Sequence, residues 1–230
     1  FLSGGIDSCT VASIASKFNN NLEGITLSFE EFENTSNDEL PLAQLAAKEF
    51  GIKSHNRLVT RKEFFSDISN ILNDMDQPSV DGINTWYVSK ATKERGYKVA
   101  LSGAGGDELF CGYPSFYQLP KVQKIFSILN SIPYGSGVAQ KAPKALESFF
   151  KSEKINLISE YSENLYKLFL FKRALFLPEE IEKFMDREIY QEGIEKIFED
   201  QLFKSGDLSF LDSLSELSFL ESSYYLGNQL

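Results

Sequence analysis

Short β-like runs alternate with amphipathic helical segments over the first third of the chain. Gly24–Phe29 and His55–Val59 have the composition of strands, and Tyr97–Leu101 is apolar enough for a buried one. Parallel strands need crossover helices between them, whereas antiparallel strands can be joined by tight hairpins. The sequence therefore predicts an α/β fold with a parallel sheet and crossover helices over residues 1–118, followed by a mainly helical region over residues 119–230.

Two helix starts within this pattern have the Ser/Thr-x-x-Glu spacing of a capping box. Ser36 with Glu39 predicts the start of one crossover helix, which Gly51 is suited to end. Thr60 with Glu63 predicts the start of the next helix, which has the clearest apolar stripe in the chain. We expect that second helix to cover one face of the sheet.

Charge and cysteine content exclude several classes of protein. The chain has 33 acidic and 23 basic residues and a net charge of −10, unlike a general nucleic-acid binder. The most apolar stretch, Leu165–Leu177, is interrupted by basic residues and is too short to span a membrane. Cys9 and Cys111 lie far apart, so neither a disulfide framework nor a zinc site is expected. These features predict a cytoplasmic protein with no nucleic-acid or membrane partner.

The first chemical motif is Ser-Gly-Gly-Ile-Asp-Ser at Ser3–Ser8, where a strand end meets a helix start. Adjacent glycines permit a tight turn, and the unpaired N–H groups of a helix start favour an anion such as a phosphate chain. Asp7 offers an oxygen ligand for Mg²⁺. The alternative is a plain strand-to-helix turn in which Asp7 is the N-cap residue.

A second glycine-rich turn, beginning at Ser102 and containing Asp107, follows the predicted strand Tyr97–Leu101. Ligands of open parallel sheets bind outside the carboxyl ends of the strands, so the two turns are expected to face one ligand. Asp7 and Asp107 would then share a magnesium ion. The alternative for Asp107 and Glu108 is a pair of acids that stabilise a helix N-terminus.

These motifs carry a resemblance to known families. Ser3–Ser8 resembles the pyrophosphate loop of the N-type ATP pyrophosphatases, whose fold is adenine nucleotide alpha hydrolase-like. Ser102–Tyr113 resembles the synthetase domain of the glutamine-dependent asparagine synthetase family, and Asp76–Ser79 resembles its intervening loop. Leu226–Leu230 resembles the run that precedes its Arg-Val-Pro-Phe-Leu-Asp segment. The resemblance therefore extends over essentially the whole chain.

The resemblance implies a ligase that activates a carboxylate with ATP, releases pyrophosphate and lets ammonia displace AMP from the acyl-adenylate. Asparagine synthesis from aspartate, with ammonia from an upstream glutaminase domain, is the implied reaction. We also consider a homodimer. The residues implied to bind ATP, through the adenosine part and then the pyrophosphate, are Leu2, Leu27, Ser102 and Gly103, followed by Ser3, Gly4, Gly5 and Ser8. Asp7 and Asp107 are the implied catalytic, magnesium-binding pair.

Ala104 departs from the family pattern, because asparagine synthetases usually have Glu or Asp after Ser-Gly. The departure keeps a related amidotransferase open, one that acts on another carboxylate such as a sugar acid. A nucleotide-binding module without catalysis is a second alternative. Phe1 has no initiator Met before it, so we expect a fragment of a longer protein whose glutaminase domain lies upstream.

Three other residues invite a functional interpretation. His55 is the sole histidine, and its strand position favours a hydrogen-bonded structural role over a catalytic base. Cys9 falls inside the first helix, which favours a buried structural thiol over a nucleophile. Trp86 could line an acceptor pocket, but aromatic residues on such a helix are more often part of the core.

Overall fold

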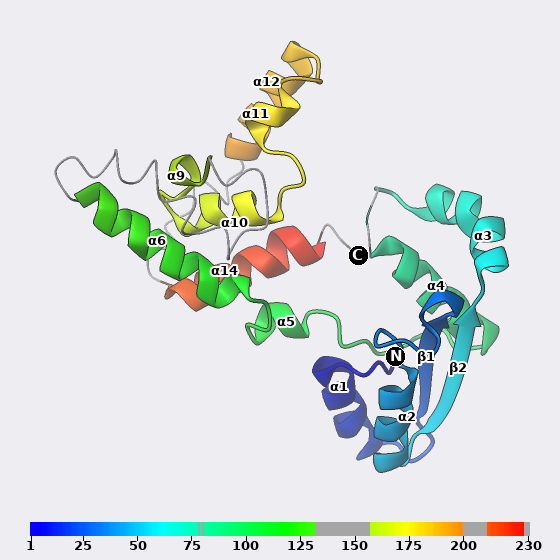
Figure 1. The fold of residues 1–230 in the computed structure, drawn as a ribbon. Helices are drawn as coiled ribbons and strands as arrows, with labels where there is room; N and C mark the ends of the chain where they lie inside the picture. The colour runs from blue at the N-terminus through cyan, green and yellow to red at the C-terminus, as the bar shows by residue number, and fades with distance from the viewer. Residues whose placement is uncertain (78, 80, 132–156, 200–210, 228–230) are drawn as a thin grey trace. The chain divides into compact units, whose positions relative to one another are not determined.

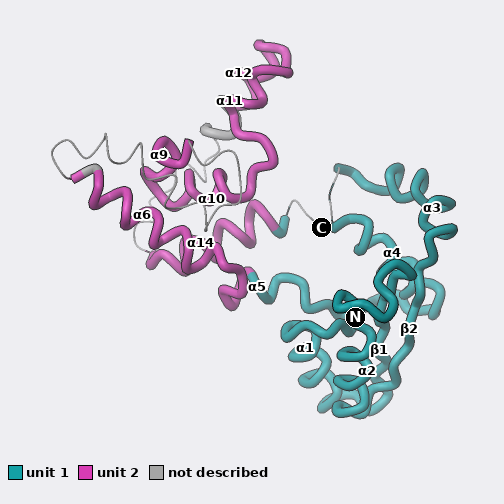
Figure 2. The backbone as a smooth tube through the Cα atoms, viewed as in Figure 1, with its two compact units in different colours: residues 1–107, 226–230 teal, residues 108–225 magenta. Residues whose placement is uncertain are grey.

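The computed structural model describes residues 1–77, 79, 81–131, 157–199 and 211–227. It divides into two compact units, which Figure 2 distinguishes by colour. Unit 1 contains Phe1–Asp107 with Leu226–Leu230, and unit 2 contains Glu108–Tyr225. The division into functional domains after residue 118 stays a prediction. The Pro-, Gly- and Ser-containing residues 132–143, which the sequence predicts to form a loose stretch, lie outside the described residues, as do residues 228–230 of the last family-like run.

Unit 1 is built on a parallel pair of strands, β1 (Glu23–Phe29) and β2 (Lys53–Val59). The strands are in register from Glu23 opposite Lys53 to Phe29 opposite Val59. The crossover between them contains α2 (Leu40–Glu49), which packs against both strands (Figure 1). The predicted mixed α/β architecture with parallel strands is therefore confirmed. The other helices up to residue 109 are α1 (Ile6–Ser16), the 3-10 turn η1 (Glu30–Phe32), α3 (Arg61–Asp74), α4 (Gly82–Glu94) and α5 (Gly106–Leu109).

The start of α2 differs from the capping-box prediction. Ser36 does not cap it, and Glu39 occupies the N-cap position without a side-chain hydrogen bond. Asp38 Oδ1 instead accepts a hydrogen bond from the Leu40 N–H at 3.0 Å. Pro41 explains the shift, because proline lacks an N–H and is best tolerated in the first turn of a helix. At α3 the prediction is half right, since Thr60 caps the helix but the Glu63 side chain binds Arg57.

Two small cores hold unit 1 together. One lies between α1, α2 and the sheet and consists of Leu2, Ala12, Ala43, Ala47 and Ile52. The other joins the end of β2 to α3 and α4 through Val59, Ile71 and Tyr87. The apolar stripe of α3 does not cover a sheet face as predicted, since the helix meets β2 near Val59 and leaves Phe65 and Leu72 exposed. Helix α4 contacts β1 instead, where the Tyr87 ring meets the Phe29 ring edge to face with centroids 6.3 Å apart.

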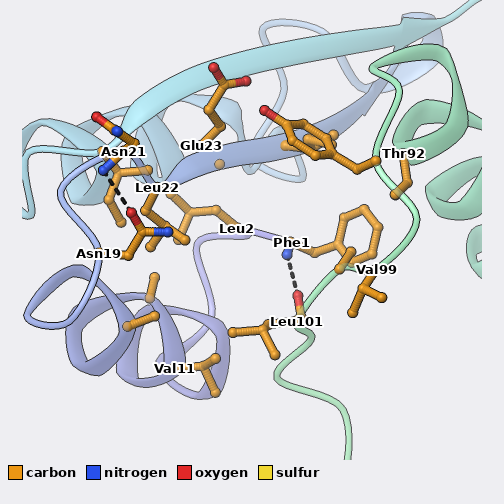
Figure 3. A pocket seen from close by; sticks show the side chains of 17 residues that line it. Phe1, Leu2, Val11, Asn19, Asn21, Leu22, Glu23, Thr92, Val99 and Leu101 are labelled. Atoms are coloured by element: carbon orange, nitrogen blue, oxygen red, sulfur yellow. Dashed lines mark hydrogen bonds between the residues drawn. The ribbon is translucent and has the colours of Figure 1, made fainter.

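Tyr97–Leu101 is not a strand, which corrects the prediction of a buried strand before the second glycine turn. The segment is exposed, and the side chain of Val99 is 80% accessible to solvent. The Phe1 N–H donates to the Leu101 carbonyl, but a cavity of about 250 Å³ lies between the segment and the start of β1 (Figure 3). A buried strand needs paired edges and covered faces. The apolar composition alone does not supply those neighbours.

The described part of unit 2 is helical, in line with the mainly helical region predicted after residue 118. Its core lies between α6, α10 and α14, where Phe116, Leu119, Phe126, Leu168, Phe169, Leu217 and Leu220 are buried together. Its elements are α6 (Ser115–Ser131), α9 (Ile158–Tyr161), α10 (Leu165–Arg173), α11 (Pro178–Ile181), α12 (Arg187–Glu199), α14 (Ser213–Leu220) and the π-helical turn η4 (Glu221–Leu226). Within the described part of the chain, no helix has the length and apolarity to cross a membrane.

Candidate functional site

The first glycine turn is fixed to the edge of β1 by the residue before it. The Leu2 N–H donates to the Ile25 carbonyl at 3.0 Å, and the Thr26 hydroxyl donates to the Leu2 carbonyl at 2.7 Å. Leu2 and Thr26 are both buried, so these bonds are shielded from water. The chain leaves the sheet after Leu2 and turns through Ser3, Gly4 and Gly5 into α1.

Two hydroxyls hold the turn in shape. Ser3 Oγ accepts a hydrogen bond from the Gly5 N–H at 3.1 Å and lies 2.8 Å from Ser8 Oγ. Ser8 Oγ also accepts a hydrogen bond from the Ser3 N–H at 3.2 Å. Ser8 itself is only 8% exposed. The first N–H groups of α1 have no carbonyl partner inside the helix, as at every helix start. The turn therefore combines hydroxyls and backbone N–H groups, which are hydrogen-bond donors suited to a phosphate.

The second glycine turn packs directly on the first. A methyl group at Gly103 would stand 2.5 Å from the Ser8 backbone nitrogen, and one at Gly106 would stand 2.5 Å and 2.6 Å from the carboxylate oxygens of Asp7. Only glycine permits these approaches. The Asp7 carboxylate thus lies against the residue that precedes Asp107. The structure brings the two motifs together within unit 1.

Position 104 is an exposed part of the second turn. The Ala104 N–H donates to Ser102 Oγ at 3.2 Å, which is a local bond across the turn. The Ala104 side chain is a methyl group, so it supplies neither a charge nor a hydrogen-bond acceptor. Sequence and structure therefore agree that this position adds no carboxylate to the site.

A cavity of about 370 Å³ lies beside the first turn, along β1. Leu2, Ser3 and Leu27 line it, and these are three of the residues expected to contact ATP. Asn84 from α4 closes another side. A second cavity of about 820 Å³ adjoins it near the ends of both strands, with Phe29 common to both linings. Volumes of this size are typical of small-molecule sites.

The site has two carboxylates that could bind a metal ion, those of Asp7 and Asp107. Among the described residues, no group of three or more His, Cys, Asp or Glu side chains could hold a metal ion. An all-protein cage is therefore not formed there. Mg²⁺ commonly takes only one or two protein carboxylates, with water and substrate phosphates as its other ligands. Asp7, pressed against the turn that carries Asp107, fits a magnesium–nucleotide complex of that kind.

Of the other residues singled out from the sequence, His55 and Trp86 make their contacts outside the two turns, whereas Cys9 contacts the first turn. His55 Nε2 is 2.9 Å from Glu23 and 2.9 Å from Arg95, so it belongs to a polar cluster at the start of the sheet. Trp86 Nε1 donates to Asp74 at 2.7 Å, and its ring packs on the core around Val59 and Tyr87. Cys9 is half-buried, and its thiol donates to the Ser3 carbonyl at 3.6 Å.

The sequence reasoning missed the role of Glu108. Glu108 lies in the short helix α5, as the helix-start alternative has it, but it is also 2% exposed and accepts a hydrogen bond from the Tyr113 hydroxyl at 2.8 Å. A further buried carboxylate, Glu221, accepts from Arg173 Nε at 2.9 Å. The signal available in the sequence was the pairing of Glu108 and Tyr113 within one motif. Their contact depends on the backbone turn between them.

A backbone feature of that turn was also missed. Cys111 has a φ of +60°, in the left-handed region that favours glycine. The sequence shows only that cysteine stands at a position next to Gly112. The positive φ lets the chain reverse between Glu108 and Tyr113, and it strains a residue that carries a Cβ.

Comparison with known proteins agrees with the motifs. The family model described as Asparagine synthase matches residues 1–229. Asparagine synthetase [glutamine-hydrolyzing] 1 of Bacillus subtilis is 34% identical over 133 residues, which cover 57% of this chain and 20% of that protein. A putative asparagine synthetase [glutamine-hydrolyzing] of Mycobacterium tuberculosis H37Rv is 34% identical over 131 residues, covering 56% and 19%.

A third relative has a different name. Amidase chyE of Penicillium rubens is 27% identical over 186 residues, which cover 72% of this chain and 26% of that protein. The chain thus spans about a fifth to a quarter of the length of these curated relatives. No solved structure matches it significantly. Because the family match extends over nearly every residue and includes both glycine turns, the chain belongs to the asparagine synthase family.

Proposed function

We propose that the chain is the ATP-dependent amidating part of a ligase with an adenine nucleotide alpha hydrolase-like fold. It would activate a carboxylate as an acyl-adenylate and pass the acyl group to ammonia. The observation that carries the proposal is the packing of Gly106 against the Asp7 carboxylate, which brings the two glycine turns together in one unit. A plain strand-to-helix turn does not require a second glycine turn at van der Waals distance.

The residues divide into two groups by what they would contact. Leu2 and Leu27, which line the cavity beside the first turn, would hold the adenosine part of ATP together with Ser102 and Gly103. The first turn would bind the pyrophosphate through Ser3, Gly4, Gly5 and Ser8, and hydrogen bonds within the turn hold it in shape. Donors fixed before the reaction stabilise charge on a leaving group without a cost of reorganisation.

Asp7 and Asp107 would hold Mg²⁺ at the phosphates. When bound, the ion neutralises negative charge on the phosphate oxygens. Substituting either carboxylate with an amide removes one negative charge at nearly constant shape. Both aspartates are only partly buried, so they remain accessible to a nucleotide complex that arrives from solvent.

The proposed chemistry has two displacements. A carboxylate oxygen of the acceptor attacks the α-phosphorus of ATP, the bond between the α-phosphorus and its bridging oxygen breaks, and pyrophosphate leaves. The nitrogen of ammonia then attacks the acyl carbon, loses a proton, and expels AMP as the amide forms. The hydroxyls and N–H groups of the first turn would contribute to the first displacement by stabilising the departing pyrophosphate.

The test is magnesium-dependent ATP binding by the full-length protein, measured by calorimetry with and without Mg²⁺. Asp7→Asn and Asp107→Asn should each lose most of the magnesium-dependent gain in affinity. Asp212→Asn is the matched control, because Asp212 caps α14 and asparagine is an equally good N-cap. Equal magnesium-dependent binding by all variants would refute the two-carboxylate site. Binding without pyrophosphate release with any carboxylate and ammonia would support a non-catalytic nucleotide-binding module instead.

Aspartate is the acceptor that the resemblance implies, and Ala104 favours a second candidate. A methyl group cannot pair with the ammonium of aspartate, and an unpaired buried charge is costly. A related amidotransferase would use a carboxylate without a neighbouring ammonium, such as a sugar acid. Pyrophosphate release with aspartate should be compared with release with uronic acids, in wild type and in Ala104→Glu. Efficient asparagine formation by the wild type would remove the second candidate.

The ammonia source, the location and the oligomeric state are further parts of the proposed function. Ammonia would come from a glutaminase domain of the same protein, in line with the glutamine-hydrolyzing names of the relatives. We keep the cytoplasm as the predicted location, since Cys9 and Cys111 are both free thiols. The homodimer stays a prediction that sedimentation of the full-length protein can test.

A further inference from the structure

We infer that Tyr113 is a positioning residue for the Asp107 carboxylate, acting through a buried hydrogen bond to Glu108. The inference rests on the proposed function, because it gives a cause for the orientation of one carboxylate of the proposed magnesium site. It concerns residues to which neither the motif nor the comparisons assign a role.

The helix that carries Asp107, α5, is intrinsically weak. Helix α5 contains four residues, Gly106–Leu109, and Gly105 directly precedes its first glycine. A single helical turn fixes several dihedral angles for few hydrogen bonds, so it is not stable by itself. Contacts made by the residues next to Asp107 therefore contribute to holding α5 and the direction of this side chain.

Glu108 makes such a contact. Its side chain is 2% exposed, and the Tyr113 hydroxyl donates to its Oε1 at 2.8 Å. A buried carboxylate without a partner would lose its hydration without compensation, so this hydrogen bond is costly to break. Because Asp107 and Glu108 are consecutive, holding the Glu108 side chain restricts the rotation of α5 and the direction of Asp107.

Tyr113 is itself held in place by its neighbours. The Arg173 guanidinium carbon lies 4.6 Å from the centroid of the Tyr113 ring and 3.7 Å from that of Tyr225. The two rings meet edge to face with centroids 6.1 Å apart. A guanidinium over an aromatic face is attracted by the electron density of the ring. Tyr113 is therefore packed by groups from α10 and from the π-helical turn η4.

Arg173 is fixed by a fully buried carboxylate. Arg173 donates to Glu221 Oε2 from Nε at 2.9 Å and from its terminal nitrogen at 2.7 Å, and the Ser115 hydroxyl donates to Glu221 Oε1 at 2.9 Å. Glu221 has no exposed surface. The network runs from Glu221 through Arg173 and Tyr113 to Glu108. It anchors Glu108, the residue that follows Asp107 in the chain, within unit 2.

The experiment compares Tyr113→Phe with Tyr161→Phe in the full-length protein. Tyr161 is the matched control, because its hydroxyl also donates to a glutamate of unit 2, Glu179, at 2.9 Å. For Tyr113→Phe, the Mg²⁺ concentration for half-maximal ATP binding should rise about tenfold, the equivalent of one hydrogen bond. It should stay within twofold of wild type, about 0.4 kcal/mol or less, in Tyr161→Phe. Glu108→Gln keeps an acceptor for the tyrosine and should lie much closer to wild type than Glu108→Ala.

Hydrogen exchange gives a readout that does not depend on ATP. The amides of Gly106–Leu109 should exchange faster in Tyr113→Phe and at the wild-type rate in Tyr161→Phe. Unchanged exchange, or equal shifts in magnesium dependence for the two phenylalanine variants, would overturn the inference. A wild-type protein that shows no magnesium-dependent ATP binding would refute the proposed function, while the exchange rates would still decide whether Tyr113 anchors α5.

Discussion

Gly103→Ala tests the close packing of the two glycine turns. The added methyl would stand 2.5 Å from the Ser8 backbone nitrogen and 2.8 Å from the Asp7 carbonyl carbon, whereas ordinary contacts begin near 3.4 Å. The turns must therefore separate by about 1 Å, against backbone atoms that have no rotamer to change. We expect the free energy of unfolding to fall by about 1–3 kcal/mol, which is typical of overpacking.

The same displacement should reach the proposed ligand site, because the methyl pushes on the turn that carries Asp7. Magnesium-dependent ATP affinity should fall by about tenfold or more, since 1.4 kcal/mol corresponds to a factor of ten. The assays are urea unfolding followed by circular dichroism, and calorimetric titration with ATP and Mg²⁺.

Gly193→Ala makes the identical chemical change at an open position. Gly193 lies in α12 with no atom within 4 Å of the added methyl, so alanine should stabilise the helix by about 1 kcal/mol and leave ATP binding unchanged. The two substitutions should thus have opposite signs. A Gly103→Ala protein with wild-type stability and ATP affinity would show that the turns do not pack as the structure has them.

Three further substitutions follow from local geometry. Cys111 has a φ of +60°, so the Cys111→Gly protein should be more stable than the Cys111→Ala protein by about 1 kcal/mol in urea unfolding, the reverse of the usual order. A more stable alanine variant would refute the left-handed turn. Thr60→Ala should cost about 1 kcal/mol, because Thr60 Oγ1 accepts the Glu63 N–H at 3.2 Å, and Thr60→Ser should restore most of it. Hydrogen bonds from Arg57 above all, and then from Lys90, lower the pKa of Glu63 to about 2. The stability from this ionised group is present above its ordinary pKa of 4.5 and is lost as the pH falls toward 2, so Glu63→Gln should flatten acid unfolding curves in that window.

Much of the site could be predicted from local sequence, because its chemistry is local. Adjacent glycines, a helix start and an aspartate within six residues indicate a tight turn suited to a phosphate, and the structure forms a tight turn there. The strands Gly24–Phe29 and His55–Val59 were found within two residues of β1 and β2, since a short crossover helix between apolar runs leaves parallel pairing as the natural arrangement. The role of each residue in binding ATP still rests on the resemblance.

Tertiary structure decided what depends on neighbours distant in sequence. Tyr97–Leu101 has the composition of a buried strand, but composition does not provide the partners that a strand edge requires, and the segment is exposed. The contact of Gly106 with Asp7 joins residues about a hundred positions apart, and no periodicity in the chain records it. The sequence suggests only a helix-start acid at Glu108, and the fold buries it beside Tyr113. The sequence determines which groups can bind or react, whereas burial and mutual distance are properties of the whole packed chain, because each is fixed by atoms that the local sequence does not contain.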